Sequence, residues 1–542
     1  MKRPFAEFRD LAAPISLLAT SAVLLRLFFW AYTHRVWEDA LITVLHSENF
    51  VRGLGLTHYR VGEARVYGFT SALGVLIPLL GDLVHVGFGL SLIKIVSALA
   101  SAAAVTFAIL IGRDLKLPRP LLWMVGGYAA FEHHQILFGM AGMETQLVVA
   151  AVLFSIWSLF HPSPIRTGVA LGICMLARPD FCLWVSIAGL FLLAKAVRGS
   201  GWRDLGVSAA AATVVFAPWL IFTWVYYGSP IPNTILAKAI GYGFWIRDPG
   251  SIRDFKAIYH EFGQTFEMLG PGFGGNGSGW HHFPGGFAVK KAMVVLVAAG
   301  LVAAIRRRDA RAMLVFSFVA VYGVFYAIGV PCLFCWYIVP FAAVSVIGAA
   351  YGAAALLQLA PRRMKTTAAA VFAILYVGPF VCVLPVTMRA ERNIQAYVED
   401  GVRKPIGQFL GAVSAHDDTI GCEPLGYIAY YSRRTVYDFP GLASRRVVDF
   451  LRLNPDKRSL DALLDHFRPT YLVLREEERR EFRKIPQDAW IDTDYALVRE
   501  FQAAPDQVRL LFHPEDNIDL HFCVLRRIRD RHGAGAAGET AR

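Results

Sequence analysis

Charged residues are scarce in this chain. They make up 18% of the 542 residues, whereas 55% are hydrophobic, and the mean hydropathy is +0.44. Apolar runs recur from about residue 11 to residue 384, and many are near the roughly 20 residues that cross a bilayer. The composition therefore excludes a soluble globular domain of this length and predicts an α-helical protein that spans a membrane several times.

Cysteine is scarce too, with seven in the chain. Cys332 and Cys335 form a CxxC pair at a predicted helix end, but a closed zinc site needs four ligands and no second pair accompanies them. Cys422 and Cys523 share the C-terminal region, and a disulfide between them is open if the compartment is oxidising. The other three fall in predicted helices, where a small buried hydrophobe is expected: Cys174, Cys182 and Cys382.

Two further absences narrow the function. No internal repeat is evident, whereas many transporters are built from repeated halves. The glycine-rich segment 270–286 lacks a Gly-Lys-Ser/Thr sequence, so it is not the phosphate loop of a nucleotide-binding protein. The net charge of +12 resides in short loops between apolar runs, which gives no indication of nucleic-acid binding.

Those basic loops predict the topology. If these loops all face the cytoplasm, as the positive-inside rule requires, the chain crosses the membrane in eleven helices. The helices are expected near 11–33, 89–112, 119–137, 144–160, 167–178, 181–198, 205–226, 288–305, 311–330, 336–358 and 366–386. The odd number places the amino terminus inside and the carboxyl-terminal region outside. The short run 72–80 is expected to lie at the outer interface.

The expected organisation is a membrane domain, a soluble domain and a tail. Residues 1–386 form the membrane domain, with a first outer loop at 34–88 and a flexible outer loop at 227–287. From 387 to 530 polar residues punctuate short apolar runs, which is typical of a small α/β domain on the periplasmic side. Residues 531–542 are rich in glycine and alanine and are expected to be disordered.

Three acids lie at predicted outer helix ends: Glu38, Asp39 and Glu144. One interpretation is that they are interfacial acids that only face water. Ionisable groups at a membrane are costly, however, and several on the same face indicate a functional site. A carboxylate there can act as a general base toward a sugar hydroxyl, or can hold a metal ion or a phosphate-bearing donor.

Basic and aromatic residues provide candidates for substrate binding. Arg178 stands between two apolar runs, so it must pair with Asp180, with a loop carboxylate or with a phosphate. Lys238 follows a turn rich in proline that includes Asn233, and it is either a phosphate ligand or a lysine that reaches the membrane surface. Further candidates are Tyr67, Tyr227, Trp280, His281 and His282.

The last three of these lie in the glycine-rich segment 270–286, which is predicted either to close over a substrate or to be a linker. Acids beside histidines leave a divalent metal ion possible. No ligand spacing requires one, so no metal site is predicted.

The motifs, taken in order, resemble the GT-C membrane glycosyltransferases, and in closer detail the bacterial branch that contains the terminal arabinofuranosyltransferases of mycobacterial cell walls. The resemblance covers nearly the whole chain. Its motifs are Glu38–Ile42, Asn49, Gly53 with Gly55, Gly62–Glu63, Val66–Ser71, Gly142–Thr145, Ala177–Asp180, Tyr227–Thr234, Ala237–Lys238, Leu425–Ser432 and Val436–Leu442. Two departures are Glu38 in place of the family's first aspartate and Tyr67 in place of its glutamate.

This resemblance implies transfer of a sugar, arabinofuranose in the family, from a polyprenyl-phosphate donor to a cell-envelope glycan, glycolipid or glycoprotein. It places the reaction at the periplasmic face of a bacterial inner membrane. Asp39 would be the leading catalytic carboxylate, with Glu38 and Glu144 beside it. Cations such as Arg178 and Lys238, with the histidines, would hold the phosphate. A flippase of lipid-linked sugars and a non-catalytic scaffold remain as alternatives.

Overall fold

The structure of the chain is a computed structural model that describes residues 4–59, 62–161, 163–199, 201–242, 262–274, 280–329, 333–485 and 490–529. It contains two compact units. The first comprises Met1–Ala40, Thr70–Pro230 and Gly243–Arg392, and the second comprises Leu41–Phe69, Ile231–Tyr242 and Asn393–Arg542. The expected disordered tail, much of the expected loop 227–287 and Cys332 lie outside the described residues.

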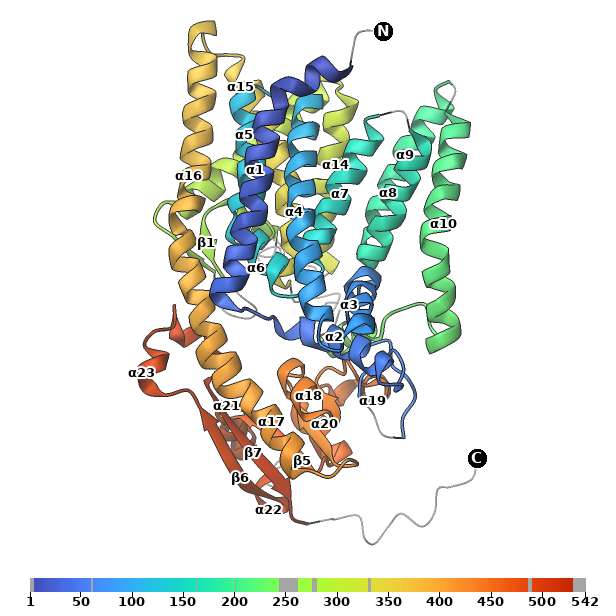
Figure 1. The fold of residues 1–542 in the computed structure, drawn as a ribbon, viewed down its shortest axis with the longest axis vertical. Helices are drawn as coiled ribbons and strands as arrows, with labels where there is room; N and C mark the ends of the chain where they lie inside the picture. The colour runs from blue at the N-terminus through green and yellow to red at the C-terminus, as the bar shows by residue number, and fades with distance from the viewer. Residues whose placement is uncertain are drawn as a thin grey trace. The chain divides into compact units, whose positions relative to one another are not determined.

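The first unit is a bundle of apolar helices that run side by side (Figure 1). Its helices are α1 (Pro4–Thr33), α3 (Ala72–Val84), α4 (Gly89–Asp114), α5 (Arg119–Phe131), α6 (His133–Met140), α7 (Thr145–Leu159), α8 (Pro164–Ala177), α9 (Cys182–Val197), α10 (Trp202–Tyr227), α13 (Gly286–Arg307), α14 (Ala310–Gly329), α15 (Cys335–Leu357) and α16 (Arg362–Ile394). Among the described residues, eight helices are long and apolar enough to cross a membrane, or nine with the bent pair α6 and α7. The chain is therefore a multi-pass α-helical membrane protein.

Three of the eleven expected spans, 119–137, 144–160 and 167–178, contain helices that are each too short to cross a membrane alone. The first of these spans is also interrupted. The stretch 119–137 breaks at Glu132, whose carboxylate accepts hydrogen bonds from the backbone N–H groups of His134 (3.0 Å) and Gln135 (2.8 Å). This carboxylate caps a new helix, α6, which then meets α7 at 116°. The expected loop 34–88 likewise contains helices, α2 (Glu38–Val51) and α3.

Glycines allow the close approach of α13 and α15. A Cβ atom on Gly352 would lie 1.9 Å from the carbonyl oxygen of Leu296 and 2.8 Å from the nitrogen of Gly300. Backbone atoms of a neighbouring helix cannot give way as a flexible side chain can. The contact therefore requires glycine at this position.

We expect Gly352→Ala to lower the stability of the membrane bundle by about 1–3 kcal/mol, because it overpacks a helix contact. The matched control is Gly189→Ala in α9, where nothing lies within 4 Å of the added Cβ and where alanine is the better helix former. Thermal unfolding of both variants in detergent measures the difference. Equal unfolding temperatures would show that α13 and α15 do not pack this closely.

The second unit contains a five-stranded mixed sheet in the order β4-β3-β5-β7-β6. Its strands are β3 (Thr419–Cys422), β4 (Thr435–Asp438), β5 (Tyr471–Arg475), β6 (Tyr495–Gln502) and β7 (His521–Arg527). The pairs β3–β4 and β3–β5 are parallel, and the pairs β5–β7 and β6–β7 are antiparallel. This arrangement confirms the expected C-terminal α/β domain.

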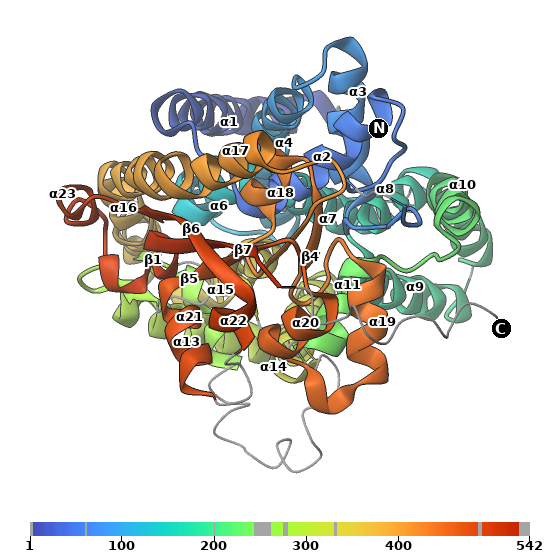
Figure 2. The same cartoon turned by 90° about the horizontal axis from the view of Figure 1, so that it is seen from below.

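Helices cover both faces of this sheet, as seen from below in Figure 2. They are α17 (Lys404–Val413), α18 (Gly426–Ser432), α19 (Arg445–Leu453), α20 (Leu460–Phe467), α21 (Glu476–Lys484), α22 (Trp490–Asp494) and the short α23 (Pro505–Val508). Along β5, Tyr471 and Val473 enter one hydrophobic core with α17 and α18, whereas Leu472 and Leu474 enter the other with α19, α20 and α22. Side chains alternate between faces along a strand, so each short apolar run supplies both cores.

The open question of a disulfide is answered by the strand order. Cys422 ends β3 and Cys523 lies in β7, and β5 runs between these two strands. Two strand spacings amount to about 9.6 Å, beyond the roughly 7 Å that a disulfide tolerates between Cα atoms. Both cysteines are buried, and neither forms a disulfide.

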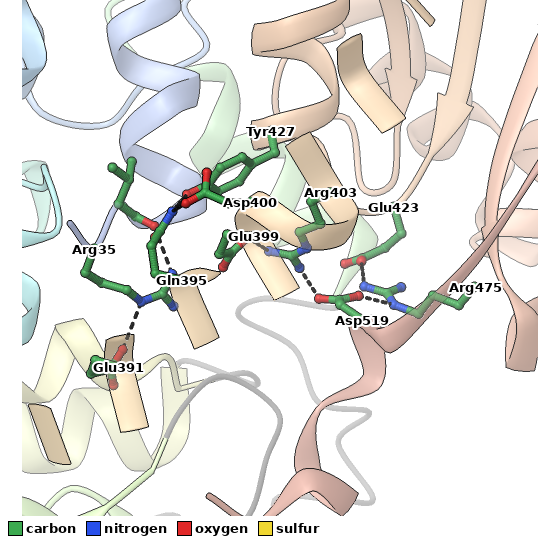
Figure 3. A network of polar contacts seen from close by, with 11 residues as sticks. Arg35, Glu391, Gln395, Glu399, Asp400, Arg403, Glu423, Tyr427, Arg475 and Asp519 are labelled. Carbon is green, nitrogen blue, oxygen red and sulfur yellow. Dashed lines mark hydrogen bonds and ion pairs between the residues drawn. The ribbon is translucent and has the colours of Figure 1, made fainter. Parts of the chain in front are cut away.

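In the second unit, a row of ion pairs joins the helical segment that precedes α17 to the sheet (Figure 3). Arg403, at the end of the wide helical segment η4 (Gln395–Arg403), forms an ion pair with Asp519 and another with Glu399 at 3.2 Å. Arg475, at the end of β5, lies 2.6 Å from Asp519 and 2.6 Å from Glu423. Burial alone would raise the pKa of Asp519, but the charges of Arg403 and Arg475 hold it below its ordinary value.

We expect Asp519 to contribute stability that is present above the ordinary aspartate pKa and is lost as the pH falls through the lower pKa of the folded state. The gap in stability between the wild type and Asp519→Asn should therefore narrow between about pH 5 and pH 3. Chemical unfolding at several pH values measures this gap, with the exposed Asp506→Asn as the control. A gap that does not change with pH would contradict the ion pairs.

Candidate functional site

The segment that follows α1 is held in place by an ion pair and by hydrogen bonds from charged side chains. Arg35 is buried, and its Nε lies 2.9 Å from Oε2 of Glu391. The buried Lys94 donates a hydrogen bond of 2.7 Å to the carbonyl oxygen of Arg35, and Nη1 of Arg35 donates to the carbonyl oxygen of Val36 at 3.0 Å. An unpaired charge buried in this position would be costly. These contacts therefore determine where the next helix begins.

That helix, α2, begins with the acidic pair. Glu38 and Asp39 occupy its first turn and are half-buried. Carboxylates are favoured there because the unpaired N–H groups at a helix start carry partial positive charge. The preceding Trp37 donates its backbone N–H to the carbonyl oxygen of Ala141 at 2.8 Å. This bond ties the acidic pair to the turn that contains Glu144.

Glu144 lies at the start of α7 and close to the acidic pair. Gly142, two residues earlier, has φ +94°, and a Cβ there would lie 2.6 Å from Leu90 and 3.0 Å from Ala40. The turn is thus pressed against the residue that follows Asp39. The charges of Asp39 and Arg178 both act on the Glu144 carboxyl group. The structure brings these three predicted residues together.

Arg178 already has an acidic partner. Its Nε lies 2.9 Å from Oδ1 of Asp180 and its Nη2 lies 3.0 Å from Oδ2, which is a two-pronged ion pair. Its guanidinium group also stacks 4.4 Å from the centre of the Tyr337 ring. Of the three partners considered for Arg178, Asp180 is confirmed. The centre formed with Asp39 and Glu144 therefore contains more acids than cations.

The Trp-His-His segment is packed rather than loose. His281 and His282 form strand β2, which pairs with β1 (Gly272–Phe273). Nε2 of His282 lies 2.8 Å from Glu267, and Trp280 stacks on His134 with ring centroids 4.7 Å apart. Residues 275–279, where a moving segment was also expected, lie outside the described residues.

Tyr227 is the last residue of α10. It is buried and packs edge-on against Tyr226, with ring centroids 4.8 Å apart. Its position is consistent with a packing role at the end of this helix.

The other predicted residues belong to the second unit, where Asn233 is a structural clamp. It begins α11 (Asn233–Gly241), and its backbone N–H donates to the carbonyl oxygen of Tyr67 at 2.8 Å. Its Nδ2 donates to the carbonyl oxygens of Gly441 (2.8 Å) and Leu442 (3.1 Å). One buried residue thus joins three segments that are distant in the sequence, and its amide N–H groups bind protein rather than substrate.

The loop that accepts these bonds is itself held by Asp438. This buried carboxylate accepts hydrogen bonds from the backbone N–H groups of Gly441 (3.2 Å) and Ala443 (3.2 Å), and also from that of Leu442. Lys238, in the last turn of α11, is half-buried. The packing of α11 thus fixes the position of Lys238 within the second unit.

Sequence reasoning missed several charged residues. Arg35 and Glu391 lie outside the motifs, and no local pattern marks a pair separated by 356 positions. Glu48 was visible only as the neighbour of Asn49. It is buried, accepts a hydrogen bond from Tyr430, and lies 2.7 Å from Nη2 of Arg433.

Asn233→Asp should destabilise the second unit by about 1–3 kcal/mol, because a carboxylate oxygen would replace the donor that faces two carbonyl oxygens. Asn393→Asp is the matched control, since Nδ2 of Asn393 makes one exposed bond, to Leu510. Thermal unfolding and limited proteolysis of the purified variants compare the two. Similar losses in both would show that the clamp is not a special contact.

Comparison of the sequence with known proteins gives matches to parts of this chain. A family described as a domain of unknown function, DUF8728, matches residues 390–516. The terminal β-(1→2)-arabinofuranosyltransferase of Mycobacterium tuberculosis is 24% identical over 271 residues, which cover 45% of this chain and 42% of that protein. The match therefore spans less than half of that relative's length.

Solved structures resemble nearly the whole chain. ArnT from Cupriavidus metallidurans in the apo state has a TM-score of 0.56 and 13% identity, and the match covers 96% of this chain and 98% of ArnT. The same protein bound to undecaprenyl phosphate gives 0.53 and 12%, with coverage of 95% and 98%. The oligosaccharyltransferase of Archaeoglobus fulgidus gives 0.51 and 12%, with coverage of 86% and 69%. The chain has the GT-C fold, as its motifs predicted.

Proposed function

We propose that this protein is a membrane glycosyltransferase that transfers a sugar from a polyprenyl-phosphate donor to a cell-envelope acceptor. The observation that carries the proposal is the meeting of Asp39, Glu144 and Arg178 within a GT-C bundle. ArnT, which shares the fold, has been solved with bound undecaprenyl phosphate, and this supports a lipid-linked donor here as well.

In the proposed reaction, an acceptor hydroxyl oxygen attacks the anomeric carbon of the donor sugar. Asp39 takes the hydroxyl proton, and the bond from the anomeric carbon to the phosphate oxygen breaks. The bonding electrons leave with the polyprenyl phosphate. Glu38, in the same helical turn, and Glu144, at the start of α7, keep the centre acidic and help to orient the acceptor.

The leaving phosphate needs cations to stabilise its developing negative charge. As the family resemblance implies, the candidates for holding the phosphate are Arg178, Lys238, His281 and His282. Arg178 is also paired with Asp180, which ties it to the acidic centre. His282 is already engaged by Glu267 at 2.8 Å.

Arabinofuranose is the proposed sugar, supported by the match to the mycobacterial arabinofuranosyltransferase. Tyr67 replaces a glutamate in the motif of that family, and we place the difference between this protein and its relatives in the acceptor. The acceptor is proposed to be a glycan, glycolipid or glycoprotein on the periplasmic face of a bacterial inner membrane.

The alternative is a flippase that moves a lipid-linked sugar without changing it. It would bind the same donor but release it intact. The GT-C fold and the acidic centre favour the transferase, since a carrier has no need of a general base.

We expect purified wild-type protein to transfer radiolabelled arabinofuranose from its polyprenyl-phosphate donor to one member of an acceptor panel. Asp39→Asn should lower the rate by about 10²-fold or more, because the amide cannot accept the hydroxyl proton. The control is Asp204→Asn, since Asp204 is a half-buried acid that pairs with Lys195 at 3.5 Å.

Full activity of Asp39→Asn would overturn the catalytic assignment. Donor binding with transbilayer movement and without product, across the whole panel, would favour the flippase.

A further inference from the structure

A group of potential metal ligands lies in the second unit, apart from the residues discussed above. Glu500, His521 and Cys523 each offer one ligand atom, and these atoms all lie within 4.8 Å of one another. They come from the edge pair of strands, β6 and β7. None of them belongs to the proposed catalytic centre, so they need a separate explanation.

The strand geometry is what brings them together. His521 and Cys523 are two positions apart in β7, so their side chains point to the same face of the sheet. Glu500 of β6 is the direct cross-strand partner of Cys523. Directly opposed residues of antiparallel strands have neighbouring side chains, which places the third ligand beside the first two.

A second carboxylate lies beside the cysteine, on the helix that follows β5. Oε2 of Glu476, the first residue of α21, lies 3.1 Å from Sγ of Cys523. Nε2 of His521 lies 3.5 Å from Oε2 of Glu500, and it has no hydrogen-bond partner among the described residues. In a tetrahedral zinc site, bonds of about 2.0–2.3 Å place the ligand atoms roughly 3.3–3.7 Å apart. The 3.5 Å between Nε2 of His521 and Oε2 of Glu500 lies within that range.

The charges also balance around a divalent ion. A thiolate and one carboxylate carry two negative charges, which the two positive charges of Zn²⁺ balance. Nη1 of Arg479 donates to Sγ of Cys523 at 3.7 Å. An outer hydrogen bond of this kind is a usual neighbour of a metal-bound sulfur.

We propose that Glu500, His521 and Cys523 form a Zn²⁺ site on the edge of the C-terminal sheet. A mixture of sulfur, nitrogen and oxygen ligands suits zinc rather than magnesium or calcium. Three protein ligands leave the fourth position of the ion to water, and the ion joins β6 to β7. Binding releases the thiol proton that Cys523 now donates to Glu476.

The test uses the full-length protein in detergent, stripped with a chelator and then loaded with Zn²⁺. Elemental analysis after desalting should find one zinc ion per chain that is lost from Cys523→Ser and His521→Ala, with affinity reduced by about tenfold or more. Zinc should also raise the unfolding temperature of the wild type and not that of these variants. Loading with Co²⁺ should give a thiolate-to-cobalt charge-transfer band.

Matched controls are His466→Ala and Cys422→Ala, which change a histidine and a cysteine of the same domain outside the cluster. Glu500→Gln provides a milder variant at an exposed position if the buried Cys523→Ser fails to fold, and it should also weaken zinc binding. Zinc retention that is equal in the cluster variants and the controls would overturn the proposal. So would the absence of retained zinc in the wild type.

Discussion

The ion pair between Arg35 and Glu391 is the contact on which the acidic centre depends. Both groups are buried, and each would be an uncompensated charge without the other. Arg35 lies directly after α1, and Glu391 lies near the end of α16, so the pair joins the first and last helices of the membrane unit. His133 lies 3.5 Å from the second oxygen of Glu391, which brings the start of α6 into the same cluster. The chain between Arg35 and Asp39 is too short to place the carboxylate independently of this pair.

Hydrophobicity predicted the long membrane helices but not the breaks within them or the contacts between distant segments. Long apolar runs such as 89–112 and 336–358 appear as helices close to their expected bounds, because a bilayer-spanning backbone must satisfy its own hydrogen bonds. The break at Glu132 lies inside an apolar run and depends on a capping bond, which hydropathy does not register. The grouping of 41–69 and 231–242 with the C-terminal domain was equally invisible, since it rests on contacts across hundreds of residues.

The site shows the same division. Residue type and position indicated that the acids Asp39 and Glu144 lie at the same membrane face, and Asp180, two positions away, was among the partners considered for Arg178. The sequence could not show whether a polar side chain already forms hydrogen bonds with other parts of the protein. Asn233 stands in a motif that resembles a substrate-binding segment, yet its donors meet carbonyl oxygens more than 200 positions away. A motif can therefore persist because it builds the fold around a site, without touching the substrate.

The charge balance of the centre bears on the proposed chemistry. The like charges of Asp39 and Asp180 act on Glu144 together with the opposite charge of Arg178, so a phosphate placed among these acids would be repelled by them. The sugar, in contrast, is stabilised by nearby negative groups, because positive charge develops at its anomeric carbon as the phosphate departs. Carboxylates beside the sugar would stabilise the positive charge that forms there, and cations beside the phosphate would stabilise its negative charge. On the proposed function, the acidic centre is thus the sugar end of the site.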